Sequence, residues 1–325
     1  MTIHCLRMPL PASAYRLATG LLLSLSVTLP ADRLPAQPPA TSRRLGAGDL
    51  DTLSLRDAGR RIAYGTDSLQ FGELRLPPRL RAGQRAPVAI VVHGGCWISS
   101  FATLRNTAAL ADSLAAAGVA TWNVEYRRAD HPGGGWPGTF IDVASAADYL
   151  RVLARQYPLD TARVVALGHS AGGHLALWLA SRRQLPAVSP VATGRPLALQ
   201  GVVSLGGVTD LEEFAARIPG GCGRGASLLL GGAPSALPDR VHVASPVRLL
   251  PLGIPTAHVA GAQDGIAPDS VRRAYVRAAT AAGDSTPVNV TVPGGHFEVN
   301  APRTEAGAMA IRQTLRLLGL APPER

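Results

Sequence analysis

The chain has 325 residues, a length that suits one large domain or two modest ones, and it shows no internal repeat that would indicate a repeat array. Its formal net charge is +10, yet all 32 basic residues are Arg, and they are scattered rather than gathered in a basic run with interleaved aromatics. We therefore expect no nucleic-acid partner.

The N-terminal 36 residues have the pattern of a secretory signal peptide. Two arginines precede an apolar run over residues 17–29 that is too short to span a bilayer, and small residues and prolines follow it. We expect cleavage after Ala36, with cleavage after Ala31 or an uncleaved anchor as the alternatives. No later segment reaches about 18 uninterrupted apolar residues. We therefore expect an exported protein, periplasmic or secreted, without stable membrane insertion.

Export determines how the cysteines are interpreted. Cys5 leaves with the signal peptide, whereas Cys96 and Cys222 remain as a candidate disulfide pair in an oxidising compartment. Residues 37–50 are polar and rich in Pro and Gly, which predicts a flexible leader. We expect the rest of the chain, residues 51–325, to form one domain.

The first half of this domain alternates short apolar runs with helical patterns. The predicted elements are antiparallel strands over 61–64 and 70–76, buried strands over 88–92 and 119–124, and helices over 106–117 and 141–156. The strand over 88–92 leads directly into the sequence His-Gly-Gly-Cys-Trp at residues 93–97. Consecutive glycines at the end of a strand free the backbone to turn its amides toward a neighbouring group.

The most informative stretch is residues 163–178, RVVALGHSAGGHLALW. A buried strand over 164–167 stops at a Gly-x-Ser-x-Gly pattern, and apolar residues then recur at helical spacing. Ser170 stands on the turn, with glycines on both sides where only small residues fit. Such a turn lifts the hydroxyl out of the sheet and directs the N–H of Ala171 toward the group that the serine attacks. The stretch predicts a nucleophile elbow, in preference to a purely structural turn.

After residue 200 the same alternation resumes. We predict strands over 201–205, 256–260 and 288–292 and helices over 270–282 and 306–318. Residues 208–250 fit no single regular element and are expected to form a small loop-rich insertion over the active site. Strands alternating with helices predict an α/β fold with a mostly parallel central sheet covered on both faces, whose ligands bind beyond the carboxyl ends of the strands.

The serine requires two partners, because a hydroxyl is a poor nucleophile near neutral pH without a base and a carboxylate that orients it. His296 follows the last predicted strand, behind two glycines, and Asp264 lies just past the end of the preceding strand. The order serine, aspartate, histidine is that of the α/β-hydrolase arrangement. We predict that Ser170, Asp264 and His296 form a catalytic triad.

Other histidines and carboxylates are weaker candidates. The elbow directs His169 away from the serine and places His174 on a helix. His258 lies within a predicted strand and is expected to be a packed core residue. Asp269, the rival of Asp264, is expected to cap a helix. No spacing typical of metal ligands appears, so we expect no metal and no cofactor.

The motifs HGGCW, EYRR, GHSAGG, the loop that carries Asp264, and GGHF follow one another in this order. Together they resemble the α/β-hydrolase superfamily, and within it the esterase and lipase group with an HGGxW motif, which includes bacterial feruloyl-esterase-like and kynurenine-formamidase-like enzymes. The resemblance implies a triad of Ser170, Asp264 and His296 and an oxyanion hole formed by Gly95, Cys96 and Ala171. Cys96 departs from the pattern, in which Gly or Tyr is common at this position. The resemblance does not cover the first 50 residues and is weakest in the insertion.

The surroundings of the predicted triad bear on the substrate. Trp97, Trp136 and Phe297 lie in or beside loops at the expected top of the sheet, and they are the predicted pocket residues, with ordinary packing as the alternative. Arg127 and Arg128 are expected to form structural salt bridges, with Glu125 or Asp142 as partners, rather than to meet an anionic substrate.

We expect a serine hydrolase that cleaves a carboxylic ester of a small or medium substrate through an acyl-enzyme on Ser170. An aryl-formamidase or a related amidase is the first alternative, because the same triad would serve. A non-catalytic binding module on a hydrolase scaffold is the second, and such a protein would be expected to lack a triad member. The sequence does not predict an oligomeric state.

Overall fold

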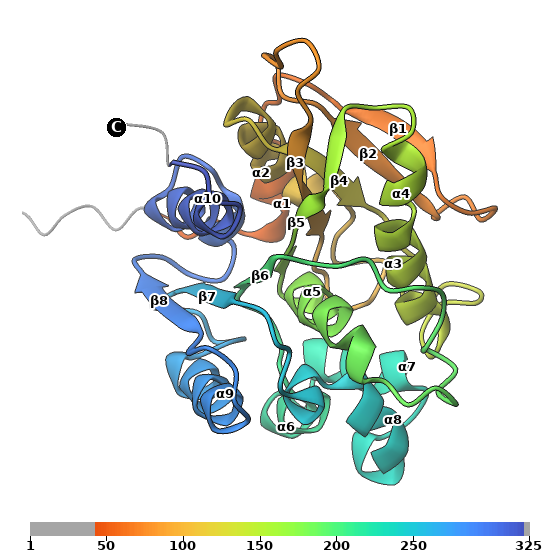
Figure 1. Cartoon of the computed structure of the whole chain (residues 1–325). Coiled ribbons are helices and arrows are strands. Elements are labelled where there is room, and N and C mark those ends of the chain that lie inside the picture. Colours follow the sequence, from red (N-terminus) through yellow and green to blue (C-terminus); the bar gives the residue numbers. More distant parts are fainter. Residues whose placement is uncertain (1–42, 322–325) are drawn as a thin grey trace, which may run out of the picture. The chain divides into compact units, whose positions relative to one another are not determined.

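The computed structural model describes residues 43–321. The expected signal peptide and residues 37–42 of the expected leader lie outside the described residues. The described chain is built around one sheet of eight strands with helices on both faces, which confirms the predicted α/β class (Figure 1).

The strands are β1 (Arg60–Ala63), β2 (Phe71–Arg75), β3 (Ala86–Val92), β4 (Ala120–Val124), β5 (Leu159–His169), β6 (Gly201–Leu205), β7 (Thr256–Gly261) and β8 (Val288–Val292). Their order in the sheet is β1-β2-β4-β3-β5-β6-β7-β8. β2 pairs antiparallel with β1 and β4, and all other neighbours pair parallel. The parallel strands end at one common edge, where the loops that carry the predicted site residues meet.

The helices are α1 (Ala47–Asp51), α2 (Arg105–Ala116), α3 (Gly138–Asp148), α4 (Leu150–Leu153), α5 (Ala171–Ser181), α6 (Leu211–Arg217), α7 (Cys222–Leu230), α8 (Pro238–Ala244), α9 (Asp269–Ala281) and α10 (Glu305–Leu317). Successive side chains of the central strands point to opposite faces. Val88 and Ile90 of β3 therefore join the core under α3 and α5, while Ala89 and Val91 join the core under α2 and α10. Both faces are apolar, which explains the unbroken hydrophobic runs in the sequence.

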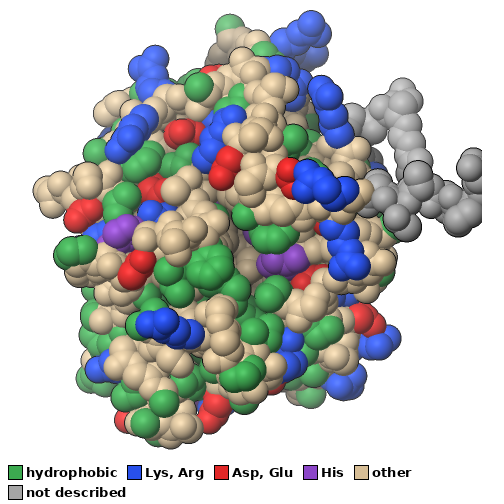
Figure 2. Space-filling model, turned by 180° about the vertical axis from the view of Figure 1, so that it is seen from behind, with side chains coloured by type: hydrophobic (Ala, Val, Ile, Leu, Met, Phe, Trp, Pro, Cys, Tyr) green, Lys and Arg blue, Asp and Glu red, His purple; other side chains and the backbone are tan. Residues whose placement is uncertain are grey.

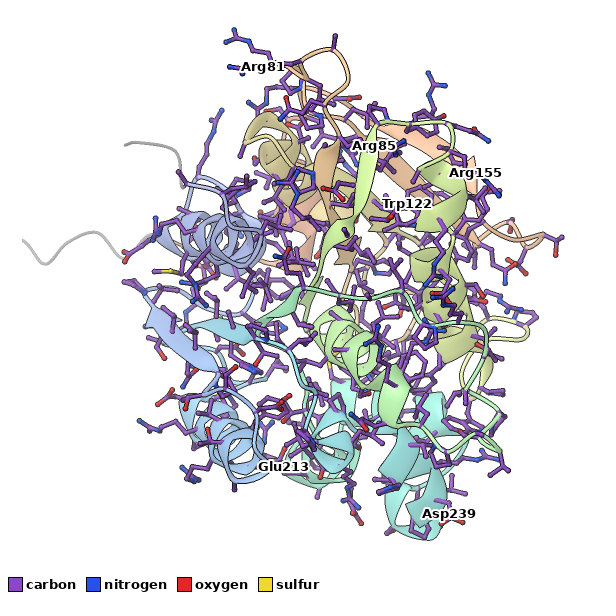
Figure 3. All side chains as sticks on the ribbon, viewed as in Figure 1. Arg81, Arg85, Trp122, Arg155, Glu213 and Asp239 are labelled. Atoms are coloured by element: carbon purple, nitrogen blue, oxygen red, sulfur yellow. A yellow bond between two sulfur atoms is a disulfide. The ribbon has the colours of Figure 1, made fainter. Side chains whose placement is uncertain are left out.

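The surface reflects the scattered charges. On the face seen in Figure 2, Arg side chains are spread among acidic and hydrophobic ones. In Figure 3, Arg81, Arg85 and Arg155 lie at the end of the molecule opposite Glu213 and Asp239, while Trp122 lies inside, where its indole N–H donates to the carbonyl of Ala146 at 2.9 Å. Within residues 43–321, no helix combines the length and the hydrophobicity that a bilayer crossing needs.

Two predictions need correction in their secondary structure. The helix expected over 141–156 begins earlier and is divided at Tyr149 into α3 and α4. The insertion at 208–250 is present, but it is helical rather than loop-rich, because buried apolar side chains attach α6, α7 and α8 to the core and Asp210 caps α6 by accepting from two backbone amides. The glycines and prolines that suggested loops lie between these short helices.

The expected flexible leader also needs correction at its C-terminal end. The structure places α1 within it, and Leu50 of this helix is only 1% exposed. Asn106 of α2 donates to the carbonyl of Ala47 at 2.8 Å and to the carboxylate of Asp51 at 3.1 Å. Polar composition predicted mobility, but one buried leucine and partners far along the chain hold the segment in place.

Candidate active site

The nucleophile elbow is built where β5 ends and α5 begins. Ser170 has φ 54° and ψ −119°, a region that non-glycine residues rarely adopt, and its N–H donates to the carbonyl of Leu205 at 2.8 Å. At Gly172, a Cβ would collide with the backbone carbonyls of Val92 and His93, so the turn requires glycine there. The surrounding strands therefore hold the serine in a strained conformation, at the carboxyl ends of the central strands.

The predicted base and carboxylate lie in contact. Nδ1 of His296 donates to Oδ2 of Asp264 at 2.9 Å, and Oδ1 of Asp264 accepts from the amides of Ile266 at 2.8 Å and Ala267 at 3.0 Å. Burial disfavours the ionised carboxylate, but the hydrogen bond and charge of His296 and the two amides outweigh it and lower the pKa of Asp264. A proton held on Nδ1 leaves Nε2 free to accept one.

Ser170 and His296 line the same cavity, although no hydrogen bond joins their side chains in the described chain. Catalytic hydrogen bonds are often long in structures without substrate and tighten in the complex. The arrangement thus brings together a strained serine, a histidine with a free ring nitrogen and a buried carboxylate.

The loop after β3 faces the serine. Gly95, Cys96 and Trp97 have φ values of 101°, 52° and 57°, three successive left-handed conformations. The amides of Gly95, Cys96 and Ala171 donate to no other group in the described part of the chain. A Cβ on Gly94 would lie 3.0 Å from Cβ of Ser170, so this loop packs directly against the elbow. These three amides are the donors that the sequence resemblance implies for an oxyanion hole.

A buried ionic network supports this loop. Oε1 of Glu125 accepts from Nε2 of His93 at 2.9 Å and from Arg128 at 2.8 Å, and Oε2 accepts from the amide of Leu104 at 3.2 Å. Burial opposes ionisation of Glu125, but His93 and Arg128 outweigh it and lower its pKa to about 2. The hydroxyl of Tyr126 donates to the carbonyl of His93 at 2.9 Å. The EYRR motif therefore holds both ends of the loop.

The cavity at the serine has a volume of about 200 Å³. Besides Ser170 and His296, it is lined by Ala47, Gly95, Cys96, Phe101, Ala102, Asn106, His169, Cys222, Ile266 and Phe297. Among residues 43–321, no Asp, Glu or Arg lines this cavity, so the space suits an uncharged and mainly apolar group.

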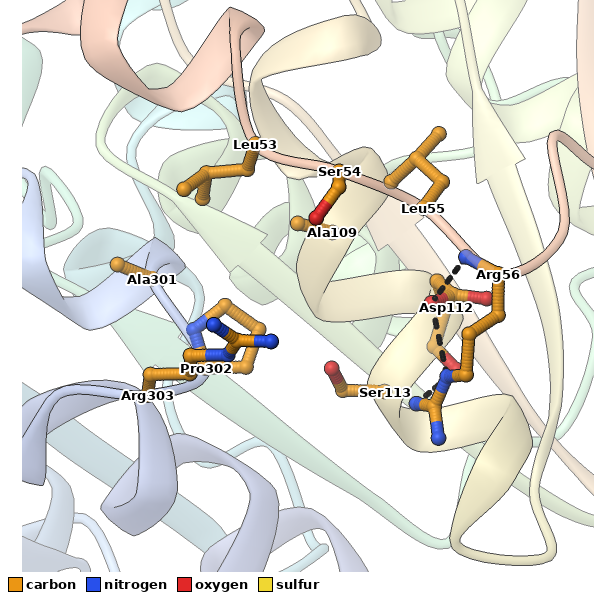
Figure 4. Close-up of a pocket in the computed structure, with 10 residues that line it drawn as sticks. All are labelled: Leu53, Ser54, Leu55, Arg56, Ala109, Asp112, Ser113, Ala301, Pro302 and Arg303. Atoms are coloured by element: carbon orange, nitrogen blue, oxygen red, sulfur yellow. Dashed lines mark hydrogen bonds and ion pairs between the residues drawn. The ribbon is translucent and has the colours of Figure 1, made fainter.

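A larger cavity of about 380 Å³ lies elsewhere, between residues 53–56, α2 and residues 301–303 (Figure 4). Its lining includes the Arg56–Asp112 ion pair, with 3.3 Å between nitrogen and oxygen. It contains no member of the serine, aspartate and histidine set, so its size does not make it the reactive site.

Comparison with known proteins places the chain in a family. The family model described as BD-FAE matches residues 74–270, a stretch that includes Ser170 and Asp264 and ends before His296. The chain belongs to the BD-FAE family. This is a family of α/β-hydrolase-like esterases, which confirms the expected esterase and lipase group.

Two curated relatives of this BD-FAE family member come from Mycobacterium tuberculosis (strain ATCC 25618 / H37Rv). Esterase LipC is 29% identical over 155 residues, which is 47% of this chain and 38% of that protein. Esterase LipQ is 25% identical over 270 residues, which is 80% of this chain and 63% of that protein. The chain thus spans less than two thirds of the length of either relative.

Solved structures share the fold. A truncated carbohydrate esterase from gut microbiota superposes with a TM-score of 0.69 at 20% identity, covering 81% of this chain and 98% of the other. Esterase B from Lactobacillus rhamnosis, bound to an inhibitor, gives 0.68 at 19% identity, covering 84% and 91%. At this identity the likeness confirms the α/β-hydrolase fold of the BD-FAE family member.

The predicted pocket residues separate in space. Phe297 lines the cavity at the serine. Trp97 does not, because it is fully buried behind the loop, edge-on to His174 and Phe214. Trp136 lines a different, shallow groove beside α8 and packs against Phe140. Neither tryptophan therefore lines the cavity at the serine, and Trp97 has the packing position that the sequence left open as the alternative.

The rival residues have other partners. Nε2 of His169 bonds the carbonyl of His296 at 2.8 Å, and Nε2 of His174 bonds the carbonyl of Ala244 at 2.8 Å. Burial lowers the pKa of His169 to about 3 and that of His174 to about 4, so both rings are neutral near pH 7. His258 is a buried core residue of β7, as predicted. Asp269 is the first residue of α9 rather than its cap, and its carboxylate accepts from Arg272 and Asn289.

The expected salt bridges are confirmed. Arg127 pairs with Asp142 at 2.7 Å, and Arg128 pairs with Glu125 at 2.8 Å. Neither arginine lines the cavity at the serine, which agrees with the structural role expected for both.

The candidate cysteine pair is joined in the structure. Sulfur atoms of Cys96 and Cys222 are bonded, with 4.7 Å between the Cα atoms. The bond links the loop after β3 to the start of α7, and both cysteines line the cavity. The insertion is thereby attached directly to the loop that faces the serine.

Several positions at the candidate site gave little or no recognisable signal in the sequence. Gly206 has φ 54°, and a Cβ there would lie 2.6 Å from Oδ2 of Asp264 and 3.1 Å from Nδ1 of His296. Ala47 and Asn106 line the cavity from segments that carry no motif. Only the Gly206-Gly207 pair at the end of a predicted strand hinted at a close backbone approach.

Proposed function

We propose that this BD-FAE family member is a serine hydrolase that cleaves a carboxylic ester of a small or medium substrate through an acyl-enzyme on Ser170. The observation that carries the proposal is the convergence, around one apolar cavity, of a strained serine, the His296–Asp264 pair and three unpaired amides. The names of the two curated relatives and the esterase family agree with ester hydrolysis.

The proposed chemistry starts with attack by Oγ of Ser170 on the ester carbonyl carbon, while its proton passes to Nε2 of His296. The carbonyl oxygen becomes negative and accepts hydrogen bonds from the amides of Gly95, Cys96 and Ala171, an interaction worth about 3 kcal/mol per donor in comparable sites. His296 then protonates the leaving alkoxide.

The second half of the reaction releases the acid. Water gives a proton to His296 and attacks the acyl carbonyl, and the collapse of this intermediate returns the proton to Oγ of Ser170. Asp264 keeps the proton of His296 on Nδ1 and stabilises the imidazolium that forms in each half. No step requires a metal ion or a cofactor.

The test is hydrolysis of p-nitrophenyl esters of increasing acyl length, beside N-formylkynurenine and an anilide, by the wild type and by Ser170→Ala. We expect turnover of short acyl esters that falls at least 1,000-fold in the variant. Preference for the formamide would instead make the chain an amidase with the same triad. No turnover of any substrate, together with no fluorophosphonate adduct on Ser170, would favour a binding module.

We also propose that the chain is exported, because the pattern of its first 36 residues is that of a signal peptide and a disulfide persists in oxidising compartments. The intact mass of the protein recovered from a bacterial periplasm tests this. A mature chain that begins after Ala36 or Ala31 supports export, and a full-length chain in the cytoplasm contradicts it.

A further inference from the structure

The N-terminal segment contributes a wall to the candidate active site. Ala47, on α1, lines the cavity together with Ser170 and His296, although it lies more than 120 residues before the serine in the chain. Its neighbour Gly48 is exposed, and a Cβ there would meet nothing within 4 Å. Ala47 therefore faces the cavity, whereas Gly48, the next residue of the same short helix, faces open space.

This wall is held rigidly. Asn106, itself part of the cavity lining, donates to the carbonyl of Ala47 and to Asp51, and it is 3% exposed. Arg105 donates to the carbonyl of Asp51 at 2.9 Å and to that of Leu53 at 2.9 Å. With Leu50 buried as well, α1 has polar and apolar attachments at Ala47 and after it, and these oppose a movement of the wall away from a larger ligand.

The same segment is tied to the loop of the catalytic histidine. Oε1 of Glu298 accepts from the amide of Leu45 at 2.9 Å, and Oε2 accepts from the amide of Gly295 at 2.9 Å. One carboxylate thus connects the residues before α1 to the residue before His296. The distance between the wall and the base is set by this bridge.

We propose that α1 sets the size limit of the apolar substrate group that lies in the cavity, and that Ala47 is a specificity-determining residue. The inference rests on the proposed function, because it concerns the substrate of the same site. Ala47, Phe101 and Phe297 make the lining apolar, and a volume of about 200 Å³ between fixed walls accepts short chains only. The substrate class is therefore an ester with a short, uncharged group on the α1 side.

The experiment compares Ala47→Leu, Ala47→Gly and Gly48→Leu, the last as a matched control that places the same side chain in open space. Two substrate series are used: p-nitrophenyl acetate, butyrate and hexanoate, which vary the acyl group, and acetates of methyl, butyl and hexyl alcohols, which vary the alcohol. The measured quantity is kcat/KM for each long ester relative to the shortest one in its series.

We expect Ala47→Leu to lower this ratio about tenfold or more in one of the two series, since one methylene group is worth at least about tenfold in a hydrophobic pocket. The affected series tells whether the acyl or the alcohol group lies against α1. Ala47→Gly, which fills nothing, should keep or raise the ratio, and Gly48→Leu should match the wild type.

Unchanged ratios in both series for Ala47→Leu, with acetate turnover intact, would overturn the proposal. A ratio lowered equally by Gly48→Leu would also overturn it, because the effect would then not depend on the cavity. The proposed function is tested separately in the same assay: its failure would appear as wild-type acetate turnover that does not depend on Ser170.

Discussion

Gly206 offers a sharp test of how the fold positions the Asp264–His296 pair. In Gly206→Ala, the added Cβ would lie 2.6 Å from Oδ2 of Asp264, where ordinary contacts begin at 3.4 Å, so the carboxylate must move by about 0.8 Å. A misplacement of about 1 Å in a catalytic site costs roughly 100-fold in rate. We therefore expect kcat to fall about 100-fold.

The same substitution also strains the backbone. Position 206 has φ 54°, and a left-handed conformation costs a residue with a Cβ about 1–2 kcal/mol. Gly253→Ala is the matched control, because Gly253 has φ 71° and a Cβ there would meet nothing within 4 Å. Both variants should lose stability through this strain, Gly206→Ala should lose more because its Cβ also collides with Asp264, and only Gly206→Ala should lose activity.

The assay is kcat for a short p-nitrophenyl ester, measured well below the melting temperature of each variant, with urea unfolding of both. Equal kcat values for Gly206→Ala and Gly253→Ala would refute the reasoning, because the contact with the carboxylate would then have no consequence. A large loss in Gly253→Ala would refute it too, since strain alone would explain the effect.

Asp264, the disulfide and His258 can each be tested by substitution. Asp264→Asn should reduce kcat about 10,000-fold while Ser170 still reacts slowly with a fluorophosphonate, because the amide favours the wrong tautomer of the base; a loss below tenfold would contradict the role of the carboxylate. Replacing Cys96 and Cys222 with Ala should lower the free energy of unfolding by up to about 5 kcal/mol, since the bond closes a loop with a sequence separation of 126, and a reductant should destabilise only the wild type. Burial lowers the pKa of His258 from 6.5 to about 3 in the folded protein. As the pH falls below about 6.5, this histidine is therefore protonated in the unfolded chain but not in the folded one, and the free energy of unfolding decreases. In His258→Phe the slope of unfolding free energy against pH between about 6 and 4 should be smaller by about 1.4 kcal/mol per pH unit, and equal slopes would show that the ring is not neutral in the fold.

The strands and helices whose apolar residues follow a regular pattern in the sequence were predictable. Buried parallel strands such as 88–92 and 164–167 are unbroken apolar runs, and the elbow combines a strand, a glycine-bounded serine and a helix within a few residues. Local pattern was enough because a strand buried on both faces requires an apolar residue at nearly every position. The His296–Asp264 contact was predictable because both residues follow ends of parallel strands, which meet at one edge of the sheet.

Other features depend on contacts between distant segments and left no local signal. The helices of the insertion are short and interrupted by glycine and proline, and their stability comes from apolar side chains that reach the core. Ala47 lines the cavity because Asn106 and Glu298 hold the N-terminal segment in place. No sequence motif at position 47 predicts this contact. Trp97 ends the HGGCW motif yet turns into the core, because the left-handed conformations of residues 95–97 redirect the chain.

The proposed reaction depends above all on Ser170 as the nucleophile. The most direct measurement is the mass of the protein after reaction with a fluorophosphonate, with the modified peptide sequenced and Ser170→Ala as the control. We expect one adduct per chain, located on Ser170, formed in parallel with the loss of ester hydrolysis and absent from the variant. Ester hydrolysis that continues at the wild-type rate in Ser170→Ala, or an inactivating adduct on another residue, would contradict this role of Ser170.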